Sequence, residues 1–294
     1  MKIFVTGASG ALGRCLLPAL LEQSHEVTAL FRSGGADAGA GIRAVTGDLL
    51  RPTSYRDELA DVDAVLHMAA VTHTNRFAEY YRVNRDGTAA LLNETKRARI
   101  GRFVFVSTRA VGPEGGAYSD SKAQAEELVR ASGLQWLILR PAEVYGFDQD
   151  EMIGRLIESA AAAAFVLVPG DGSYELAPIH IEDLVLAMSR LVGKNGAAVG
   201  VLTLAGPESL SINEWIDTIG GARELLPLKI HVPLALLSIA ASTMALLHIR
   251  KPPIVKDQVA RLVLAKDADI APARRTIDFD PRTVGEYLAA QEVV

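Results

Sequence analysis

The sequence has little of several features that define whole classes of protein. It contains one cysteine, Cys15, in 294 residues, which excludes an intrachain disulfide and any metal site built from several cysteines. A lone cysteine is typical of a reducing compartment, and we expect Cys15 to be a buried apolar residue of a helix. There is no long run of basic residues and the net charge is −5, which argues against nucleic-acid binding. No second histidine has metal-ligand spacing to His67, so no metal site is predicted.

Long apolar runs are also scarce. The first residues resemble a strand and a turn rather than a charged and then apolar leader, which favours a cytoplasmic protein. The one uncharged apolar stretch, 232–247, falls short of the roughly 20 residues that a membrane span needs. Three interpretations stay open: a small-lobe helix that lines an apolar pocket or subunit contact, an interfacial helix on a membrane, and, least favoured, a span. Ser238, Ser242 and Thr243 favour the first, and the basic residues beyond the stretch favour the second.

What the chain does have is a distinctive opening, MKIFVTGASGALG. Lys2–Thr6 has the pattern of a short buried strand, and glycines follow at three-residue spacing at Gly7, Gly10 and Gly13. Glycines between a strand and a helix permit a tight turn, close approach of a pyrophosphate and close packing of the helix on the strand. This stretch therefore predicts a dinucleotide-binding turn.

Short β-branched runs and helical patterns then alternate through the first half. Strands are predicted at 2–6, 26–31, 42–46, 64–67, 102–107 and 135–139, and helices at 11–23, 52–59, 77–98 and 117–131. Alternation of this kind indicates an α/β fold, a Rossmann-type doubly wound parallel sheet with helices on both faces. Because ligands of such sheets lie beyond the carboxyl ends of the strands, functional residues are expected just after each strand.

The loops after the second and third strands concern the adenosine end of the cofactor. The second strand is followed by Arg32 and no nearby acid, so a 2′-phosphate is favoured over free ribose hydroxyls, and NADP is preferred to NAD. Asp48 after the third strand offers a carboxylate to the adenine amino group, or starts the next helix instead. After the fourth strand, Ala69 and Ala70 leave room for a ligand, and His67 is expected to be a packed, hydrogen-bonded residue.

The fifth strand leads to the predicted chemistry. It ends in Ser107 and Thr108, and Tyr118 and Lys122 follow four residues apart, on one face of a helix. A tyrosine that exchanges protons near neutral pH needs a lowered pKa, which a neighbouring ammonium provides. Either hydroxyl at the strand end can hold the substrate oxygen. These residues predict an acid/base centre beside the dinucleotide.

The chain resembles the extended short-chain dehydrogenases/reductases, the NAD-dependent epimerase/dehydratase-like group. The matching segments, in order, are TGASGALG at 6–13, GDL at 47–49, HMAA at 67–70, VNRDGT at 83–88, VSTRAVG at 106–112, YSDSK at 118–122, RPAEVYG at 140–146 and PIHIEDL at 178–184. The segments at 169–184 and 278–288 also resemble atypical members, such as the NADPH-binding accessory subunit of respiratory complex I. Such members often lose the tyrosine, whereas this chain keeps both Tyr118 and Lys122.

The resemblance implies roles for individual residues. Tyr118 would be the catalytic acid/base, Lys122 would bind the nicotinamide ribose and lower the Tyr118 pKa, Thr108 would orient the reacting oxygen, and Asn84 would hold the helix near the site. The cofactor would be lined by Gly7, Ser9, Gly10, Ala11, Leu12, Gly13, Arg32, Asp48, Leu49, Ala69, Ala70, Ser107, Tyr118, Lys122, Pro141 and Val144. Substrate contacts would come from Thr108, His73, Glu143 and Tyr145.

Two departures from the family bear on the substrate. Only nine residues separate Thr108 from Tyr118, where sugar-nucleotide epimerases carry a longer loop, and Glu143 replaces a residue that is often small or neutral. We therefore expect hydride transfer at a carbonyl or hydroxyl carbon of a small, fairly apolar molecule. The alternatives are a nucleotide-sugar epimerase or dehydratase, and a non-catalytic NADPH-binding assembly protein.

The second half predicts a smaller, mostly helical lobe. We expect residues 1–146 to form the NAD(P)-binding domain, 176–204 to return to it, and 147–175 and 205–294 to form the substrate lobe. An alanine run at 160–164 favours helix, Gly170–Ser173 predicts a hairpin or turn, and 181–191 is amphipathic. The family suggests a homodimer through the helices at 77–98 and 117–131.

Overall fold

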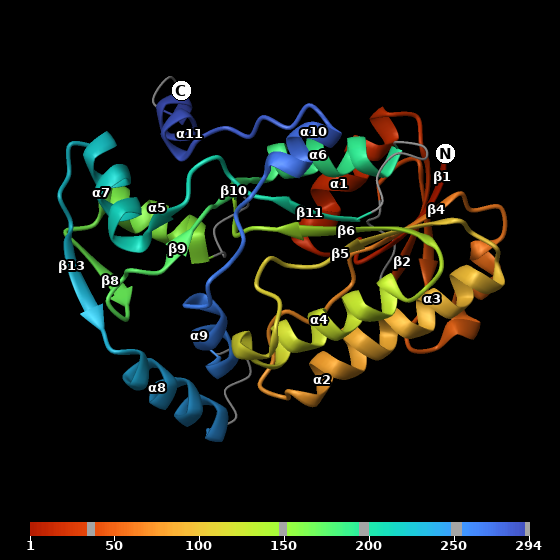
Figure 1. Ribbon diagram of the computed structural model, residues 1–294, viewed down its shortest axis with the longest axis horizontal. Helices are drawn as coiled ribbons and strands as arrows, with labels where there is room; N and C mark the ends of the chain where they lie inside the picture. Colours follow the sequence, from red (N-terminus) through yellow and green to blue (C-terminus); the bar gives the residue numbers. More distant parts are fainter. Residues whose placement is uncertain (34–38, 147–151, 194–199, 248–254, 292–294) are drawn as a thin grey trace.

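A seven-stranded parallel sheet forms the centre of the molecule, as the computed structural model shows (Figure 1). The structure describes residues 1–33, 39–146, 152–193, 200–247 and 255–291. The strand order is β11-β6-β5-β4-β1-β2-β3. The strands are β1 (Lys2–Thr6), β2 (Glu26–Phe31), β3 (Ile42–Thr46), β4 (Ala64–His67), β5 (Arg102–Val106), β6 (Gln135–Pro141) and β11 (Gly200–Leu204). The predicted Rossmann-type fold is confirmed.

Strand β1 shows why the sheet is buried on both faces. Its side chains alternate, so Ile3 and Val5 enter one hydrophobic cluster and Phe4 enters the other. All three are fully buried. Helices cover both faces, as a parallel sheet with continuous apolar strands requires.

Two helix pairs cover the sheet. On one face α1 (Ala11–Glu22) packs against α6 (Ile181–Gly193), and on the other α3 (Gly87–Arg97) packs against α4 (Gly116–Arg130) (Figure 1). The expectation that Cys15 is buried is wrong. Cys15 is exposed on α1 because Gly13, Leu16, Leu17 and Leu20 form the face that meets the sheet.

Two predicted helices take other forms. The segment 52–59 is two 3-10 turns, Pro52–Ser54 and Arg56–Leu59. The long helix at 77–98 divides into α2 (Ala78–Tyr80), a π-helical stretch over Tyr81–Asp86, and α3. A π-helical stretch inside a helix is often found at functional sites, and this one contains Asn84.

The smaller lobe lies at the end of the molecule opposite to β1 and β2 (Figure 1). It contains β8 (Phe165–Pro169) paired in parallel with β13 (Leu228–Val232), and β9 (Glu175–Leu176) paired with β12 (Leu210–Ser211). Its helices are α5 (Met152–Ala162), α7 (Ile212–Ala222), α8 (Leu234–Leu246), α9 (Lys256–Leu262) and α11 (Val284–Gln291). The segment 170–173 is therefore a turn and not a hairpin, because β8 and β9 pair with different strands.

The chain returns to the larger half twice. Strand β11 pairs with β6, and α10 (Ala271–Thr276) places Ile270, Ala273 and Phe279 in the core beside the sheet. Part of 205–294 therefore packs on the nucleotide-binding half.

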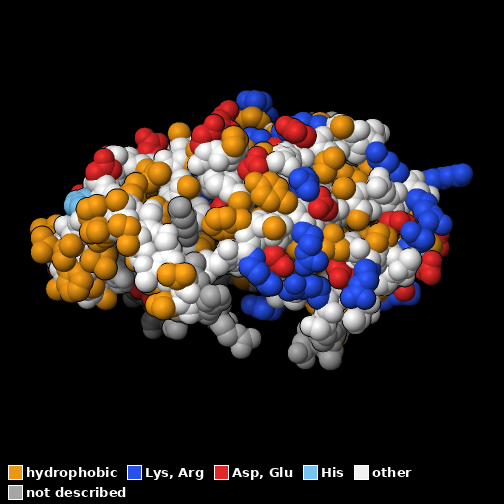
Figure 2. Space-filling view, turned by 90° about the horizontal axis from the view of Figure 1, so that it is seen from below, with side chains coloured by type: hydrophobic (Ala, Val, Ile, Leu, Met, Phe, Trp, Pro, Cys, Tyr) orange, Lys and Arg blue, Asp and Glu red, His pale blue; other side chains and the backbone are white. Residues whose placement is uncertain are grey.

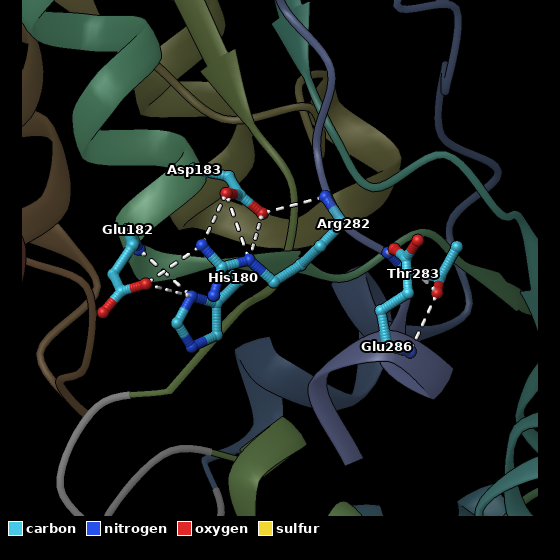
Figure 3. Close-up of polar contacts among 6 residues, drawn as sticks. All are labelled: His180, Glu182, Asp183, Arg282, Thr283 and Glu286. Atoms are coloured by element: carbon cyan, nitrogen blue, oxygen red, sulfur yellow. Dashed lines mark hydrogen bonds and ion pairs between the residues drawn. The ribbon is translucent and has the colours of Figure 1, made fainter. Parts of the chain in front are cut away.

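Ion pairs of Arg282 hold the C-terminal segment against the start of α6 (Figure 3). Arg282 donates hydrogen bonds to the Asp183 carboxylate through Nε and Nη2 at 3.0–3.2 Å, and its Nη2 forms an ion pair with Glu182 at 3.0 Å. Thr283 and Glu286 then cap α11, since each backbone N–H donates to the other side chain, at 2.7 and 3.0 Å.

One end of the small lobe is covered by exposed apolar side chains (Figure 2). They come from β8, β13, α8 and the residues beside them, and include Phe165, Leu167, Leu226, Leu228, Ile230, Leu236, Ile239, Leu246 and Leu247. Leu226 is 88% exposed and Leu246 76%. We call this surface the apolar face. No helix in the described part of the chain is long and apolar enough to cross a membrane.

Candidate active site

A cleft of about 1830 Å³ runs along the carboxyl ends of the strands and reaches the small lobe. This volume exceeds the roughly 300–1,000 Å³ of a typical ligand pocket, so a dinucleotide and a second molecule have room together. Every residue predicted to line the cofactor lies on its wall, from Gly7, Ser9, Gly10, Ala11, Leu12 and Gly13 through to Pro141 and Val144.

The glycine turn at the start of α1 fits a dinucleotide phosphate. Gly7 has a φ of 81°, and a Cβ there would lie 2.6 Å from the Ala69 nitrogen. A Cβ at Gly13 would lie 2.5 Å from the Ala8 oxygen, so only glycine lets the helix pack this closely. Gly10 precedes the first turn of α1, whose N-terminus faces the cleft.

The adenosine end of the cleft contains Arg32 and Asp48 on adjacent loops. Arg32 is exposed on the wall directly after β2. Asp48 Oδ1 accepts a hydrogen bond from the Leu50 N–H at 3.0 Å, so Asp48 orders its own loop while it lines the cleft. A cation and no carboxylate thus follow β2 within the described residues, up to Ser33.

Tyr118 and Thr108 both line the cleft, and a hydrogen bond joins their side chains. Lys122 lies one turn further along α4, where its Nζ donates to the Val106 carbonyl at 2.7 Å and lies 4.1 Å from the centroid of the Phe105 ring. The spacing of Tyr118 and Lys122 therefore brings both to the wall of the cleft, as predicted, with a strand-end hydroxyl beside them.

The cation that acts on the pKa of Tyr118 differs from the one predicted. Burial raises the pKa of Tyr118 above its ordinary value, while the positive charge of Arg261 and the Thr108 hydrogen bond lower it in part. Arg261 stacks on the Tyr118 ring, with Cζ 4.6 Å from its centroid. In this structure, the cation that acts on the Tyr118 pKa is Arg261 from α9 rather than Lys122. Burial lowers the pKa of Lys122 itself to about 7.

Ser107 and Asn84 serve as supports. Ser107 lines the cleft, but its hydroxyl donates to Glu126 at 2.6 Å, and Glu126 also binds Arg140. Asn84 does not line the cleft. It pairs with the backbone of Val71 at 2.8 and 3.1 Å and donates to Ser121 at 3.1 Å, joining a cleft loop to α4.

His67 lies deep in the sheet as a bridging residue. Its ring nitrogens contact the hydroxyls of Thr6 at 2.6 Å and Thr88 at 2.9 Å. Burial, and the Lys122 charge to a smaller extent, lower the His67 pKa to about 3, so the ring is neutral at physiological pH. This matches the expected packed histidine.

The predicted substrate residues divide into two groups. Thr108, His73 and Glu143 line the cleft. Tyr145 does not, because side chains alternate along β7 (Val144–Tyr145) and only Val144 faces the cleft. Tyr145 is buried in the small-lobe core against His180 and Tyr287.

Four charged residues near the site were not predicted from the sequence. Arg109 and Lys266 both bind the Glu143 carboxylate, at 2.7 and 2.9 Å. Asp257 Oδ1 accepts from the Tyr118 N–H at 3.3 Å, and Arg261 covers the Tyr118 ring. Three of the four come from a segment about 140 residues beyond Tyr118, which carries no local motif. Of the four, only Arg109 could have been suspected from the sequence, because it directly follows Thr108.

Comparisons with known proteins agree with this geometry. The family model "NAD dependent epimerase/dehydratase family" matches residues 3–202. A ketoreductase of Stigmatella aurantiaca, named for 4-hydroxy-2-methyl-3-oxo-4-farnesyl-3,4-dihydroquinoline-1-oxide, is 33% identical, with 71% of this chain and 70% of that protein covered. The 2-alkyl-3-oxoalkanoate reductase of Stenotrophomonas maltophilia is 28% identical, with 96% and 95% covered.

Among solved structures, MoeE5 in complex with UDP-glucuronic acid and NAD superposes with a TM-score of 0.76 at 25% identity, covering 98% of this chain and 97% of that one. The glycine turn, the tyrosine and lysine of α4 and the family match over two thirds of the sequence lead to one assignment. The chain belongs to the NAD dependent epimerase/dehydratase family, and it is an NAD(P)-dependent enzyme of the oxidoreductase and epimerase type.

Proposed function

We propose that the protein interconverts a ketone and a secondary alcohol, with NADP(H), on a substrate that has a large apolar part. The observation that carries this proposal is the setting of Tyr118. Tyr118 and Thr108 line the same cleft as the glycine turn, and the small lobe contributes apolar residues to the wall of that cleft. That wall contains Ile153, Pro169, Leu237, Val255, Val259 and Leu262.

Relatives named as ketone-acting enzymes support this proposal. The two reductases described above are named for an oxo compound with a farnesyl group and for a 2-alkyl-3-oxoalkanoate. Both names combine a ketone with an apolar chain, which matches the apolar residues that line this cleft.

The chain's own residues supply the proton. When bound, the cofactor supplies or accepts hydride. In the direction of reduction, the substrate oxygen accepts hydrogen bonds from Tyr118 and Thr108, and Tyr118 gives its proton as negative charge develops on that oxygen. Arg261 places positive charge near the resulting tyrosinate, which offsets part of the effect of burial.

The test is oxidation of methyl 3-hydroxydecanoate with NADP⁺, followed as NADPH absorbance. We expect turnover by the wild type, and a fall of about 10²–10⁴-fold in Tyr118→Phe, since one acid/base group is lost. NADPH binding of Tyr118→Phe should stay close to wild type. Equal turnover by both proteins would refute the role of Tyr118.

The preference for NADP is tested at Arg32. We expect Arg32→Ala to weaken NADPH binding about tenfold or more, because a charge-assisted bond to phosphate is lost, and to leave NADH binding almost unchanged. Fluorescence titration of both nucleotides measures this. Similar losses for both nucleotides would show that Arg32 does not recognise a 2′-phosphate.

A nucleotide-sugar epimerase is the second candidate, favoured by the match to MoeE5, which was solved with UDP-glucuronic acid. UDP-glucose and UDP-glucuronic acid, incubated with the wild type and either cofactor, provide the comparison. Conversion of either sugar without turnover of the hydroxy ester would favour this candidate over ketone reduction.

We also propose that the apolar face rests on a lipid surface. Helix α8 borders both the face and the cleft, because Leu236 and Ile239 are exposed on it while Leu237 lines the cleft. A substrate with an apolar chain could then reach the cleft from lipid without crossing water.

A further inference from the structure

We infer that the substrate carries a carboxylate within one or two carbons of the reacting carbon, and that Arg261 binds it. The inference rests on the proposed function and narrows its substrate to a hydroxy acid or oxo acid. It starts from an excess of positive charge beside Tyr118.

Arg261 is positioned to meet an anion at the reacting centre. It lines the cleft from α9, with its guanidinium over the Tyr118 ring and Nη2 donating to the Thr72 carbonyl at 3.1 Å. Within the described residues, Arg261 forms no ion pair with a carboxylate. A guanidinium has five N–H donors, so most of its capacity is available to a ligand.

Two further cations lie at this end of the cleft. Arg109 and Lys266 share the single carboxylate of Glu143, and their side chains are only 2% and 3% exposed. The Arg109 Nε is buried with no hydrogen-bond partner in the described structure. Burial lowers the pKa of Lys266, and Glu143 raises it in part, while the smaller effects of the Arg109 and Arg261 charges lower it, so the three cations repel one another.

The carboxylates on the cleft wall do not balance these charges. Among the described lining residues, the acids are Asp48, at the adenosine end, and Glu143. Asp257 lies one turn before Arg261 on α9 but does not line the cleft, and its Oδ1 binds the Tyr118 N–H in the first turn of α4. Three cations thus share two carboxylates, Glu143 and Asp257, and the excess positive charge is costly unless a ligand supplies the anion.

The position of Arg261 identifies the kind of anion. A group bound beside the Tyr118 ring lies close to the carbon whose oxygen contacts Tyr118 and Thr108. A planar carboxylate also matches the guanidinium fork. The cofactor diphosphate belongs at the glycine turn before α1, and the diphosphate of a sugar nucleotide lies a whole sugar ring away from the reacting carbon. A carboxylate attached near the carbonyl meets these conditions.

The decisive experiment measures binding, so it does not require turnover. Decanoate and methyl decanoate are titrated against the NADPH complex of the wild type, Arg261→Gln, Arg261→Lys and the control Arg97→Gln, whose side chain is exposed on α3. We expect the wild type and control to bind decanoate at least about tenfold more tightly than the ester, the effect of a charge-assisted hydrogen bond. Arg261→Gln should bind both alike, and Arg261→Lys should restore part of the preference.

Equal affinity of the wild type for decanoate and its ester would overturn the inference, as would a preference that Arg261→Gln retains. NADPH affinity, measured in the same titration, shows that each variant is folded.

A kinetic comparison separates this inference from the proposed function. The wild type should oxidise 3-hydroxydecanoate with a higher kcat/KM than its methyl ester, and Arg261→Gln should abolish this ratio by slowing oxidation of the acid more than oxidation of the ester. Equal slowing of acid and ester would mean that Arg261 acts only on Tyr118, which contradicts the carboxylate site. Turnover of neither compound by the wild type would count against the proposed function, while the binding result would still decide the inference.

Discussion

Lys122 illustrates how one buried residue couples the site to stability. Its ammonium lies wholly inside the protein, bonded to the Val106 carbonyl and against the Phe105 ring, and burial lowers its pKa to about 7. In the unfolded chain a lysine keeps a pKa of about 10.4. Between these values the unfolded state binds more protons than the folded state, so the free energy of unfolding rises with pH in this window.

This difference predicts a pH-dependent effect of Lys122→Met. Without cofactor, the free energy of unfolding of the wild type should rise, relative to that of the variant, by up to about 1.4 kcal/mol per pH unit between pH 7 and pH 9. Below pH 7 the difference should level off, because lysine is protonated in both states. Urea unfolding at pH 6, 7, 8 and 9 measures it, with Lys96→Met on the surface of α3 as the control. A constant difference across this range would contradict the assigned burial effect.

At the residue scale, local spacing determined what could be predicted. Tyr118 and Lys122 lie one helical turn apart and Thr108 ends a strand, so sequence alone placed them on the cleft wall. Arg261 and Lys266 reach the same space through the small lobe, and neither composition nor periodicity near them indicates that contact. Tyr145 was misplaced because alternation along a two-residue strand directs its side chain away from its neighbour Val144.

At the scale of elements, α9 anchors the helix that carries Tyr118. The residues that begin α4 provide no side-chain cap, and Asp257 of α9 supplies the acceptor instead, at 3.3 Å from the Tyr118 nitrogen. A carboxylate at this position also interacts favourably with the positive end of the helix. The contact joins the two parts of the molecule at the reacting tyrosine.

Removing this cap should have a graded effect. We expect Asp257→Ala to lower the free energy of unfolding by about 1–2 kcal/mol, since an acceptor for the first turn of α4 is lost. Asp257→Asn keeps the acceptor and should cost less than half as much. Urea unfolding of both variants at pH 7 provides the measurement. Equal losses in the two variants would show that the charge, and not the hydrogen bond, is what α4 requires.

The elements themselves were predictable to different degrees. The six strands of the first half follow from short β-branched runs and were confirmed within two residues, because most of these runs are buried; the edge strand β3 is partly exposed. The π-helical stretch at 81–86 could not be foreseen, because a single wider turn leaves the apolar period of a helix nearly unchanged. The two 3-10 turns at 52–59 begin at a proline, and only Tyr55 and Leu59 of this segment are buried, too little for the sequence pattern to separate the turns from a helix.

At the scale of the whole molecule, the apolar face sets the small lobe apart from an ordinary surface. Its two strands and α8 expose large side chains, and the one charge that β13 contributes, Lys229, is paired with Asp217 at 2.6 Å. Helix α8 has 13 residues, about 20 Å, which is shorter than the roughly 30 Å hydrocarbon core of a bilayer. The helix can therefore lie on a membrane surface but cannot span it.

The proposed lipid contact predicts binding to vesicles of zwitterionic phosphatidylcholine. We expect the wild type to sediment with them, and binding to persist at about 0.5 M salt, because burial of apolar area rather than charge drives it. The double variant Leu236→Glu/Ile239→Glu should remain in the supernatant, since it places two carboxylates on the face. Leu128→Glu on α4, outside the face, should bind like the wild type.

The same proteins distinguish lipid from a second copy of the chain as the occupant of this face. If the apolar face joins two copies, the wild type should elute as a dimer in size-exclusion chromatography, and the double variant should elute as a monomer. Vesicles would then leave the wild type in solution, because its apolar side chains would already be buried. A wild type whose elution the double substitution leaves unchanged, and which sediments with vesicles only when Leu236 and Ile239 are intact, would place the entrance of the cleft beside the lipid from which an apolar substrate can enter.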